Sequence, residues 1–454
     1  MSDNNNFVRN ADNLKKDLTL PLVFCVGLKQ IIGAGFIAFT GMAIAMTGAG
    51  VPLAYFLAAL TSILAGIPFA ILGSAMPVTG GMYSWPSRIL SPMTGFMSIW
   101  IFFLSNFTLS IYALTASGYI QEFYPNISPT FCAITILTVF YILNLVGAKA
   151  TATVGMFLTI ILLMALVLFI GMGLPKVNPG QLSDILPKGV PGLMSAGGLL
   201  IFTTFGAALV AELGGEMKNP GRDIPITIIG ATSLAALLYV LGATVAVGVL
   251  PIETVAGQKL TIVANEVMSH WAFVFFTVAA GIISIMGVIN AQMLWGSKSL
   301  LVACDDNWLP RWLGTVNKRF GTPHFLLSGL YLLGVLPILT GLSINDLATS
   351  SNITAIMTQI IVVFSCYMLY RKYQPIYNQG LFKIKNGVVL LVLVIFAVTL
   401  NAYLVYSLFD MIGTWTTFYI IVGWVSAGFI IALLRRNYVT PYRIDESLKT
   451  PAQP

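Results

Sequence analysis

Charged side chains are scarce in this chain, in which Asp, Glu, Lys and Arg make up 9% of the 454 residues. Because soluble domains contain about 25% charged residues, this scarcity excludes a soluble protein of ordinary design. Histidine is scarcer still: His270 and His324 are the only two, and their spacing fits no metal site. Without an H-E-x-x-H pattern or paired intramembrane aspartates, we expect no metal, no cofactor and no enzyme activity.

Cysteine is sparse as well, and no pairing pattern connects the four residues of this type. They lie in or at the edges of apolar runs, at Cys25, Cys132, Cys304 and Cys366. We interpret them as buried small apolar side chains rather than as redox groups. No cleavage site precedes the first apolar run, which predicts that this run is retained as a span.

Apolar residues are what the chain has in abundance, with 57% hydrophobic residues and a mean hydropathy of +0.89. Apolar runs of about 20 residues recur throughout, each long enough to cross a hydrocarbon core of about 30 Å. Barrel strands are excluded, because they alternate apolar and polar residues over about ten positions. We predict an all-α polytopic membrane protein with twelve spans, near residues 19–45, 51–75, 93–121, 129–147, 152–174, 192–216, 225–250, 270–304, 324–341, 346–370, 386–407 and 414–434.

Lysine and arginine are distributed unevenly between the loops that join these spans. If both termini lie in the cytoplasm, the outer loops hold only Lys176, Lys188 and Lys259, and most other basic residues lie inside. Basic residues concentrate in the cytoplasmic loops of membrane proteins. We therefore expect a multi-pass protein of the cytoplasmic membrane with both termini inside. The net charge of +7 then reflects topology and not a nucleic-acid partner.

Two of the predicted spans are interrupted by glycine. The first contains Gly33-Ala34-Gly35, and the sixth contains "TTFGAALVAELGG" at residues 203–215. They are five spans apart and so cross the membrane in opposite directions. Glycine-interrupted spans in matching halves indicate the substrate site of an inverted-repeat transporter. The alternative is that these glycines only let helices pack closely.

Five motifs, in order and over roughly residues 19–435, carry a resemblance to a known family. They are "IIGAGFI" (Ile31 to Ile37), "MPVTGGMYSW" (Met76 to Trp85), "ELGGEMKNPGRDIP" (Glu212 to Pro225), "GSKSLLVACDDNWLP" (Gly296 to Pro310) and "NKRFGTPH" (Asn317 to His324). Together they resemble the amino acid–polyamine–organocation permeases, which have the LeuT-type fold. The fourth motif matches only in part, because Lys298, Val302 and Asn307 replace the family's usual residues.

The resemblance implies a fold of two inverted five-helix repeats with discontinuous helices one and six, followed by two further helices. The corresponding segments are an N-terminal cytoplasmic tail (1–18), a first repeat (19–174), a second repeat (192–370), two C-terminal helices (386–434) and a C-terminal cytoplasmic tail (435–454).

The resemblance also implies where a substrate binds. A helix broken inside the membrane frees backbone groups that lipid cannot satisfy. Half-helix N-termini suit a carboxylate and freed carbonyls suit an ammonium, so an α-amino acid fits both. Carried over from the family, the binding residues are Ile31, Ile32, Gly33, Ala34 and Gly35 in span one, and Phe202, Thr203, Phe205, Gly206 and Ala208 in span six.

Spans three and eight supply further candidates. With Gly95 as the family's landmark, Phe102 and Ser110 face the breaks, with Asn106 one turn between them. Asn106 and Ser110 share a helix face and could bind substrate or tie span three to a neighbouring helix. Span eight offers Asn290, Gln292 and Trp295. At most one of Asn290 and Gln292 faces a cavity, because they point about 200° apart.

A lysine is the least expected residue in the first span. Lys29 is about ten residues into the span, which places it about 15 Å deep, so it needs a partner. Glu212 and Glu216, four residues apart in span six, are the candidate counter-ions. We expect Lys29 to pair with Glu212 and to gate the inner vestibule, with Glu216 at the family's acidic position. The alternatives are a static helix tie and a countercharge for an acidic substrate.

The resemblance implies an amino acid transporter that works by alternating access, with neutral amino acids as the default substrate. Leu162 stands close to where some family members carry a coupling lysine, and Ala208 replaces an acidic residue of the exchangers for cations. The absence of a titratable group in span five favours an exchanger. A proton-coupled symporter of amino acids or amines and a transport-inactive sensor are the alternatives.

The outer loop "QEFYPNISPT" lacks the cysteine with which heteromeric family members bind a glycoprotein. We therefore expect a monomer or homodimer in the lipid bilayer, with no disulfide-linked subunit and a small-molecule substrate.

Overall fold

The computed structural model describes residues 9–33, 35–121, 124–410 and 415–439. Within these ranges the chain is helical, with no strands and only three isolated β-bridges. The predicted all-helical fold is therefore confirmed. The tails, which were predicted as residues 1–18 and 435–454, lie partly outside the described residues.

The helices of the first half begin at the predicted first span. They are α1 (Leu20–Ile31), α2 (Gly35–Thr47), α3 (Val51–Ala75), α4 (Gly81–Ile89), α5 (Pro92–Leu104), α6 (Thr108–Gln121), α7 (Pro129–Val146) and α8 (Ala148–Gly173). The second half contains α9 (Gly189–Thr204), α10 (Pro220–Gly248), α11 (Ile252–Val255), α12 (Thr261–Val267), α13 (His270–Thr277), α14 (Ser284–Trp295), α15 (Lys298–Asp305), α16 (His324–Thr340), α17 (Ile344–Lys372), α18 (Gln374–Gln379), α19 (Gly387–Asp410) and α20 (Trp415–Arg435).

Ten helical segments of the described ranges are long and apolar enough to cross a membrane. The first of them, Leu20–Ala75, contains α1, α2 and α3. Helix α16 is apolar but shorter than the others. Large apolar side chains such as Phe157 and Val167 of α8 and Val392 of α19 are exposed on the outside of the bundle. This outward-facing apolar surface suits a hydrocarbon environment, which has no need of polar groups.

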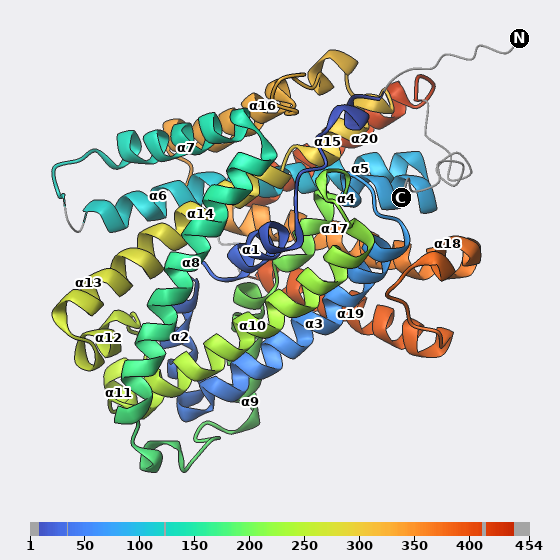
Figure 1. Ribbon diagram of the computed structural model, residues 1–454. Helices are drawn as coiled ribbons and strands as arrows, with labels where there is room; N and C mark the ends of the chain where they lie inside the picture. Colours follow the sequence, from blue (N-terminus) through green and yellow to red (C-terminus); the bar gives the residue numbers. More distant parts are fainter. Residues whose placement is uncertain (1–8, 34, 122–123, 411–414, 440–454) are drawn as a thin grey trace, which may run out of the picture.

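Small residues allow the longest helices to pack closely in the middle of the bundle. Helices α3 and α10 lie side by side over much of their length (Figure 1). Gly66 and Gly73 of α3 face Ile228 and Ile224 of α10, respectively. Such small-residue contacts are the usual way in which membrane helices approach one another. Helix α17 packs against α5 and α19.

Candidate functional site

The first predicted span is interrupted where its glycines stand. Helix α1 ends at Ile31, where Ile32 adopts φ −84° and ψ 84°, and α2 begins at Gly35. Ala34 lies outside the described residues. The hydroxyl of Tyr239 donates to the carbonyl oxygen of Ile31 at 3.1 Å, and this contact satisfies a carbonyl that the interruption removes from the helix.

The sixth predicted span is interrupted as well. Helix α9 ends at Thr204, and after Phe205 and Gly206 the chain continues as a 3₁₀ helix over Ala207–Glu212. The backbone of Gly206 lies directly against Gln30, because a Cβ added to Gly206 would come within 2.4 Å of the carbonyl oxygen of Gln30. Only glycine allows this approach. The two interruptions therefore contact one another, although about 170 residues separate them.

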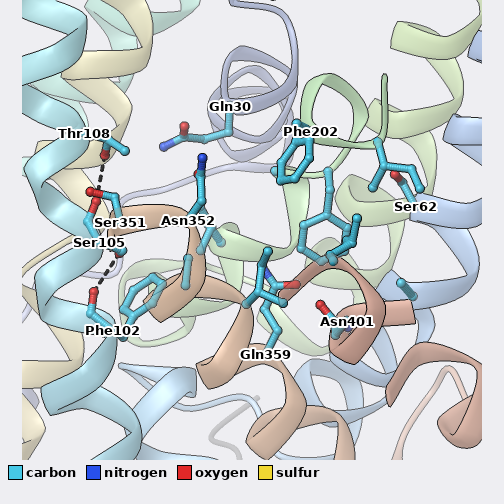
Figure 2. A pocket seen from close by; sticks show the side chains of 18 of the residues that line it. Gln30, Ser62, Phe102, Ser105, Thr108, Phe202, Ser351, Asn352, Gln359 and Asn401 are labelled. Atoms are coloured by element: carbon cyan, nitrogen blue, oxygen red, sulfur yellow. Dashed lines mark hydrogen bonds between the residues drawn. The ribbon is translucent and has the colours of Figure 1, made fainter. Parts of the chain in front are cut away.

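A cavity of about 180 Å³ lies beside this contact (Figure 2). It is bordered by α1, α3, α5, α6, α9, α14, α17 and α19. Its lining residues are Gln30, Ser62, Ala65, Phe102, Ser105, Thr108, Tyr112, Ile201, Phe202, Phe205, Gly206, Leu209, Gln292, Trp295, Ser351, Asn352, Ala355, Ile356, Gln359, Leu400, Asn401 and Leu404. None of these residues is an Asp, Glu, Lys, Arg or His, so the cavity presents aromatic, aliphatic and uncharged polar groups.

Several of the residues that the sequence singles out are brought together in this cavity. They are Phe102, Phe202, Phe205, Gly206, Gln292 and Trp295. The rings of Phe102 and Trp295 lie 5.6 Å apart and form one wall. Gln292 is held in place because its Nε2 donates to Asn106 at 3.0 Å and to Thr108 at 2.9 Å.

The other candidates lie outside the cavity lining. Ser110 donates to the carbonyl of Gly334 at 2.7 Å, which ties span three to α16. Asn290 donates to the carbonyl of Thr151 at 3.0 Å and so connects α14 with α8. Ile31, Ile32, Thr203 and Ala208 are buried, whereas Gly33 and Gly35 stay partly exposed at the interruption.

Comparison with known proteins decides the family. A family model described as amino acid permease matches residues 18–430 of this chain. The chain belongs to the amino acid permease family. It is a permease of the amino acid–polyamine–organocation superfamily, as the motifs indicate, and a multi-pass membrane transporter rather than an enzyme.

Relatives of this permease carry names that differ in substrate. The branched-chain amino acid permease BcaP of Bacillus subtilis is 26% identical over 398 residues, which cover 80% of this chain and 82% of that protein. The methylthioribose transporter of the same species is 25% identical over 448 residues, 92% of each chain. The amino-acid permease RocE is 24% identical over 392 residues, 80% of this chain and 83% of RocE. Family membership therefore supports amino acid transport, and the names of the relatives differ in the substrate that they give.

The sequence did not predict that α17 and α19 of this permease contribute polar residues to the cavity. Ser351, Asn352 and Gln359 of α17 and Asn401 of α19 all line it. One signal was present: Ser351 and Gln359 are eight residues apart, and residues four or eight apart share one face of a helix. Uncharged polar residues at that spacing in an apolar helix mark a face turned away from lipid.

The predicted ion pair between Lys29 and Glu212 is wrong. Glu212 instead accepts hydrogen bonds from the backbone N–H of Met82 at 2.7 Å and from the hydroxyl of Ser299 at 2.6 Å. These partners come from α4 and α15, so Glu212 joins those two helices. The prediction failed because it considered only charged partners, whereas a backbone N–H and a hydroxyl satisfy a buried carboxylate equally well.

Glu216 has a charged partner, although a different one. Its carboxylate lies 2.8 Å from the Nζ of Lys298, and both side chains are buried. Lys298 thus anchors the start of α15. Breaking a buried pair leaves an uncompensated charge, so this contact strongly favours the arrangement in which it forms.

Lys29 itself is buried without a polar partner among the residues that the structure describes. Its side chain crosses to α14 and fills the space above Gly287, where an added Cβ would lie 1.7 Å from the Cε of Lys29. A static tie between α1 and α14 and a role in gating both stay predictions for Lys29.

A second charged cluster lies at the end of α15. Asp306 accepts two hydrogen bonds from Arg88, at 2.5 and 3.0 Å, one from Arg9 at 3.1 Å and one from the hydroxyl of Tyr83 at 2.6 Å. Burial and the Asp306 carboxylate raise the pKa of Tyr83 above its ordinary value, so its hydroxyl keeps the proton that it donates. This cluster connects the N-terminal segment, α4 and the end of α15.

Proposed function

We propose that this permease carries neutral amino acids across the cytoplasmic membrane by alternating access around the cavity between its two interrupted spans. One observation supports the proposal most directly. Gln30, in the last turn of α1 before the first interruption, contacts Gly206 in the second interruption, beside a cavity whose lining residues include no charged side chain. A zwitterion needs no net countercharge, whereas a cation or an anion would lose its hydration there without one.

We propose a LeuT-type fold of twelve spans, with the bounds that the sequence suggests. The first repeat is 19–174, the second is 192–370, and 386–434 forms two further spans, with both termini cytoplasmic. This count follows if Leu20–Ala75 is divided into two spans and α16 is included.

The main-chain groups of the substrate are proposed to bind at the interruptions. The first N–H groups of α2, from Gly35 onwards, lack partners within their own helix and favour a carboxylate. Gly33 and Gly35 are partly exposed, so these groups can be approached. The rest of the predicted set is proposed to border the same site: Ile31, Ile32, Ala34, Phe102, Ser110, Phe202, Thr203, Phe205, Gly206 and Ala208.

Glu212 and Glu216 are proposed to take part in gating. The backbone carbonyl of Glu212 accepts from the N–H of Gly80, and its carboxylate binds α4 and α15. Glu216 pairs with Lys298, the first residue of α15. These bonds join α4 and α15 to the segment that follows α9, and we propose that gating forms and breaks them.

Exchange is proposed as the mode of transport. Helix α8 carries no titratable side chain between residues 152 and 173, so a proton has no obvious site on this helix. Proton symport and a sensor without transport are the competing functions.

Counterflow in proteoliposomes is the test of this proposal. Vesicles that contain the purified permease and an excess of unlabelled amino acid are expected to accumulate the same labelled amino acid without an imposed proton gradient. A panel of neutral, cationic and acidic amino acids identifies the class, and methylthioribose is included because a relative carries that name. Accumulation that depends on a proton gradient would favour symport, and binding without uptake would favour a sensor.

Replacing Lys29 with methionine tests the proposed role of this residue in gating. We expect the variant to withstand heating at least as well as wild type, because an unpaired cation at mid-membrane costs about 2.5–3.5 kcal/mol on insertion scales. Counterflow is expected to fall clearly, since gating would lose its buried charge. Exposed Lys372 replaced with methionine is the control. Normal counterflow of Lys29→Met, with unchanged substrate preference and pH dependence, would refute a gating role.

A further inference from the structure

The cavity has a polar region that lies away from the interrupted spans. Ser351, Asn352 and Gln359 of α17 and Asn401 of α19 line this region. In Figure 2 the amide of Asn352 points toward that of Gln30, and the amides of Gln359 and Asn401 lie further along the cavity. The aromatic rings of Phe102 and Phe202 border the same space.

The polar groups of this region have unused hydrogen-bonding capacity. Ser351 is fully buried, and its hydroxyl has no partner among the described residues. The buried Nε2 of Gln30 likewise has none. No side-chain hydrogen bond to any described residue occupies the amides of Asn352 and Gln359, and Asn401 uses only its Nδ2, which donates to Ala397 at 2.8 Å.

Some polar groups elsewhere in the same cavity are already satisfied, although the indole Nε1 of Trp295 has no partner among the described residues. Gln292 is satisfied by Asn106 and Thr108, and Ser105 donates to the carbonyl of Phe102 at 2.6 Å. The bonds of Gln292 join α14 to the Asn106–Thr108 segment, and the bond of Ser105 stays within its own helical stretch. Buried polar groups in proteins are nearly always paired, so unpaired amide and hydroxyl groups that share one cavity indicate a partner that enters it.

The chemistry of the region defines that partner. Amides offer both donors and acceptors, and a hydroxyl can act as either. An uncharged carboxamide or hydroxyl can satisfy both kinds of group, whereas an ammonium offers only donors and a carboxylate only acceptors. An aliphatic side chain would leave all of these groups unpaired, which polar sites strongly disfavour.

We propose that Gln359 and Asn401, with Ser351 and Asn352, form a subsite for the substrate's side chain that selects amino acids with a carboxamide or a hydroxyl group over aliphatic ones. The proposal rests on the transport of neutral amino acids proposed above. Gln30 links the two parts of the site, because its backbone carbonyl contacts Gly206 at the interruption and its side chain lines the cavity. An amino acid whose α-carbon lies at the interruptions can therefore extend its side chain toward α17 and α19.

The test measures substrate preference by counterflow in proteoliposomes of the full-length permease. Wild type is expected to take up glutamine, asparagine, serine or threonine at least about tenfold better than leucine, valine or methionine. Gln359→Leu and Asn401→Leu are each expected to reduce this ratio about fivefold or more, because each removes hydrogen bonds to the side chain. Gln379→Leu changes an exposed glutamine of α18 and is the matched control, with the ratio unchanged.

A second measurement keeps the test decisive if a variant does not fold. In detergent, glutamine or serine should raise the melting temperature of wild type in a concentration-dependent manner, and leucine should not. Wild type that prefers leucine or valine, or variants with an unchanged ratio, would overturn the subsite while leaving amino acid transport intact. Absence of counterflow with every amino acid would instead overturn the proposed function and the subsite with it.

Discussion

Replacing Gly206 with alanine is expected to reduce counterflow at least about tenfold while the protein still inserts in the membrane. The added Cβ would lie 2.4 Å from the carbonyl oxygen of Gln30 and 2.8 Å from its carbonyl carbon. Both atoms belong to the backbone, so no side-chain rotation removes the overlap. The two interrupted spans must then move apart, and a displacement of about 1 Å is enough to impair a site built on geometry.

Gly198 provides the matched control for this prediction. It lies in the same helix, α9, where an added Cβ would meet no atom within 4 Å. Gly198→Ala should transport as wild type and be slightly more heat-stable, because alanine is favoured over glycine in a helix by about 1 kcal/mol. If Gly206→Ala transports as well as Gly198→Ala, the contact between the interruptions has no part in transport.

The interruptions themselves could be predicted from the sequence, and the reason is physical. Glycine occurs inside two apolar runs, where a membrane helix would normally be continuous: at Gly33 and Gly35 in one and at Gly206 in the other. Only a cavity or a neighbouring backbone makes such a break tolerable in a membrane. Both are present here, since Gly206 contacts Gln30 and the cavity lies beside them.

Partners of buried charges could not be predicted in the same way. The sequence favours a pair between Glu212 and Lys29 because the two side chains carry opposite charges and both lie in predicted spans. Spacing along one helix, however, does not show what the neighbouring helix presents. Met82 and Ser299 satisfy Glu212 through a backbone N–H and a hydroxyl, neither of which charge counting detects. Helices α17 and α19 were missed for a related reason, because which face of an apolar helix turns inward depends on packing across the whole bundle.

Replacing Arg88 with glutamine is expected to cause a large loss of stability. Arg88 is nearly fully buried, with 5% of its side chain exposed, and it makes two hydrogen bonds to Asp306. Glutamine cannot replace the planar charged fork of arginine. Removing one partner of a buried ion pair typically costs about 3–5 kcal/mol, which is a large part of the roughly 5–15 kcal/mol by which native proteins are stable.

Arg222→Gln is the control that separates the effect of burial on stability from the effect of losing a positive charge. Arg222 also pairs with an aspartate, Asp223, at 3.0 Å, but 55% of its side chain is exposed. Exposed pairs contribute about 0–1 kcal/mol, so Arg222→Gln should behave almost as wild type. The measurement is the fraction of monodisperse protein left in detergent after heating, whose midpoint should fall by about 5 °C or more for Arg88→Gln alone. Arg9 still reaches Asp306 in this variant. An equal midpoint for both variants would therefore show that Arg9 and Tyr83 compensate fully for Arg88, and that the cluster does not depend on any single cation.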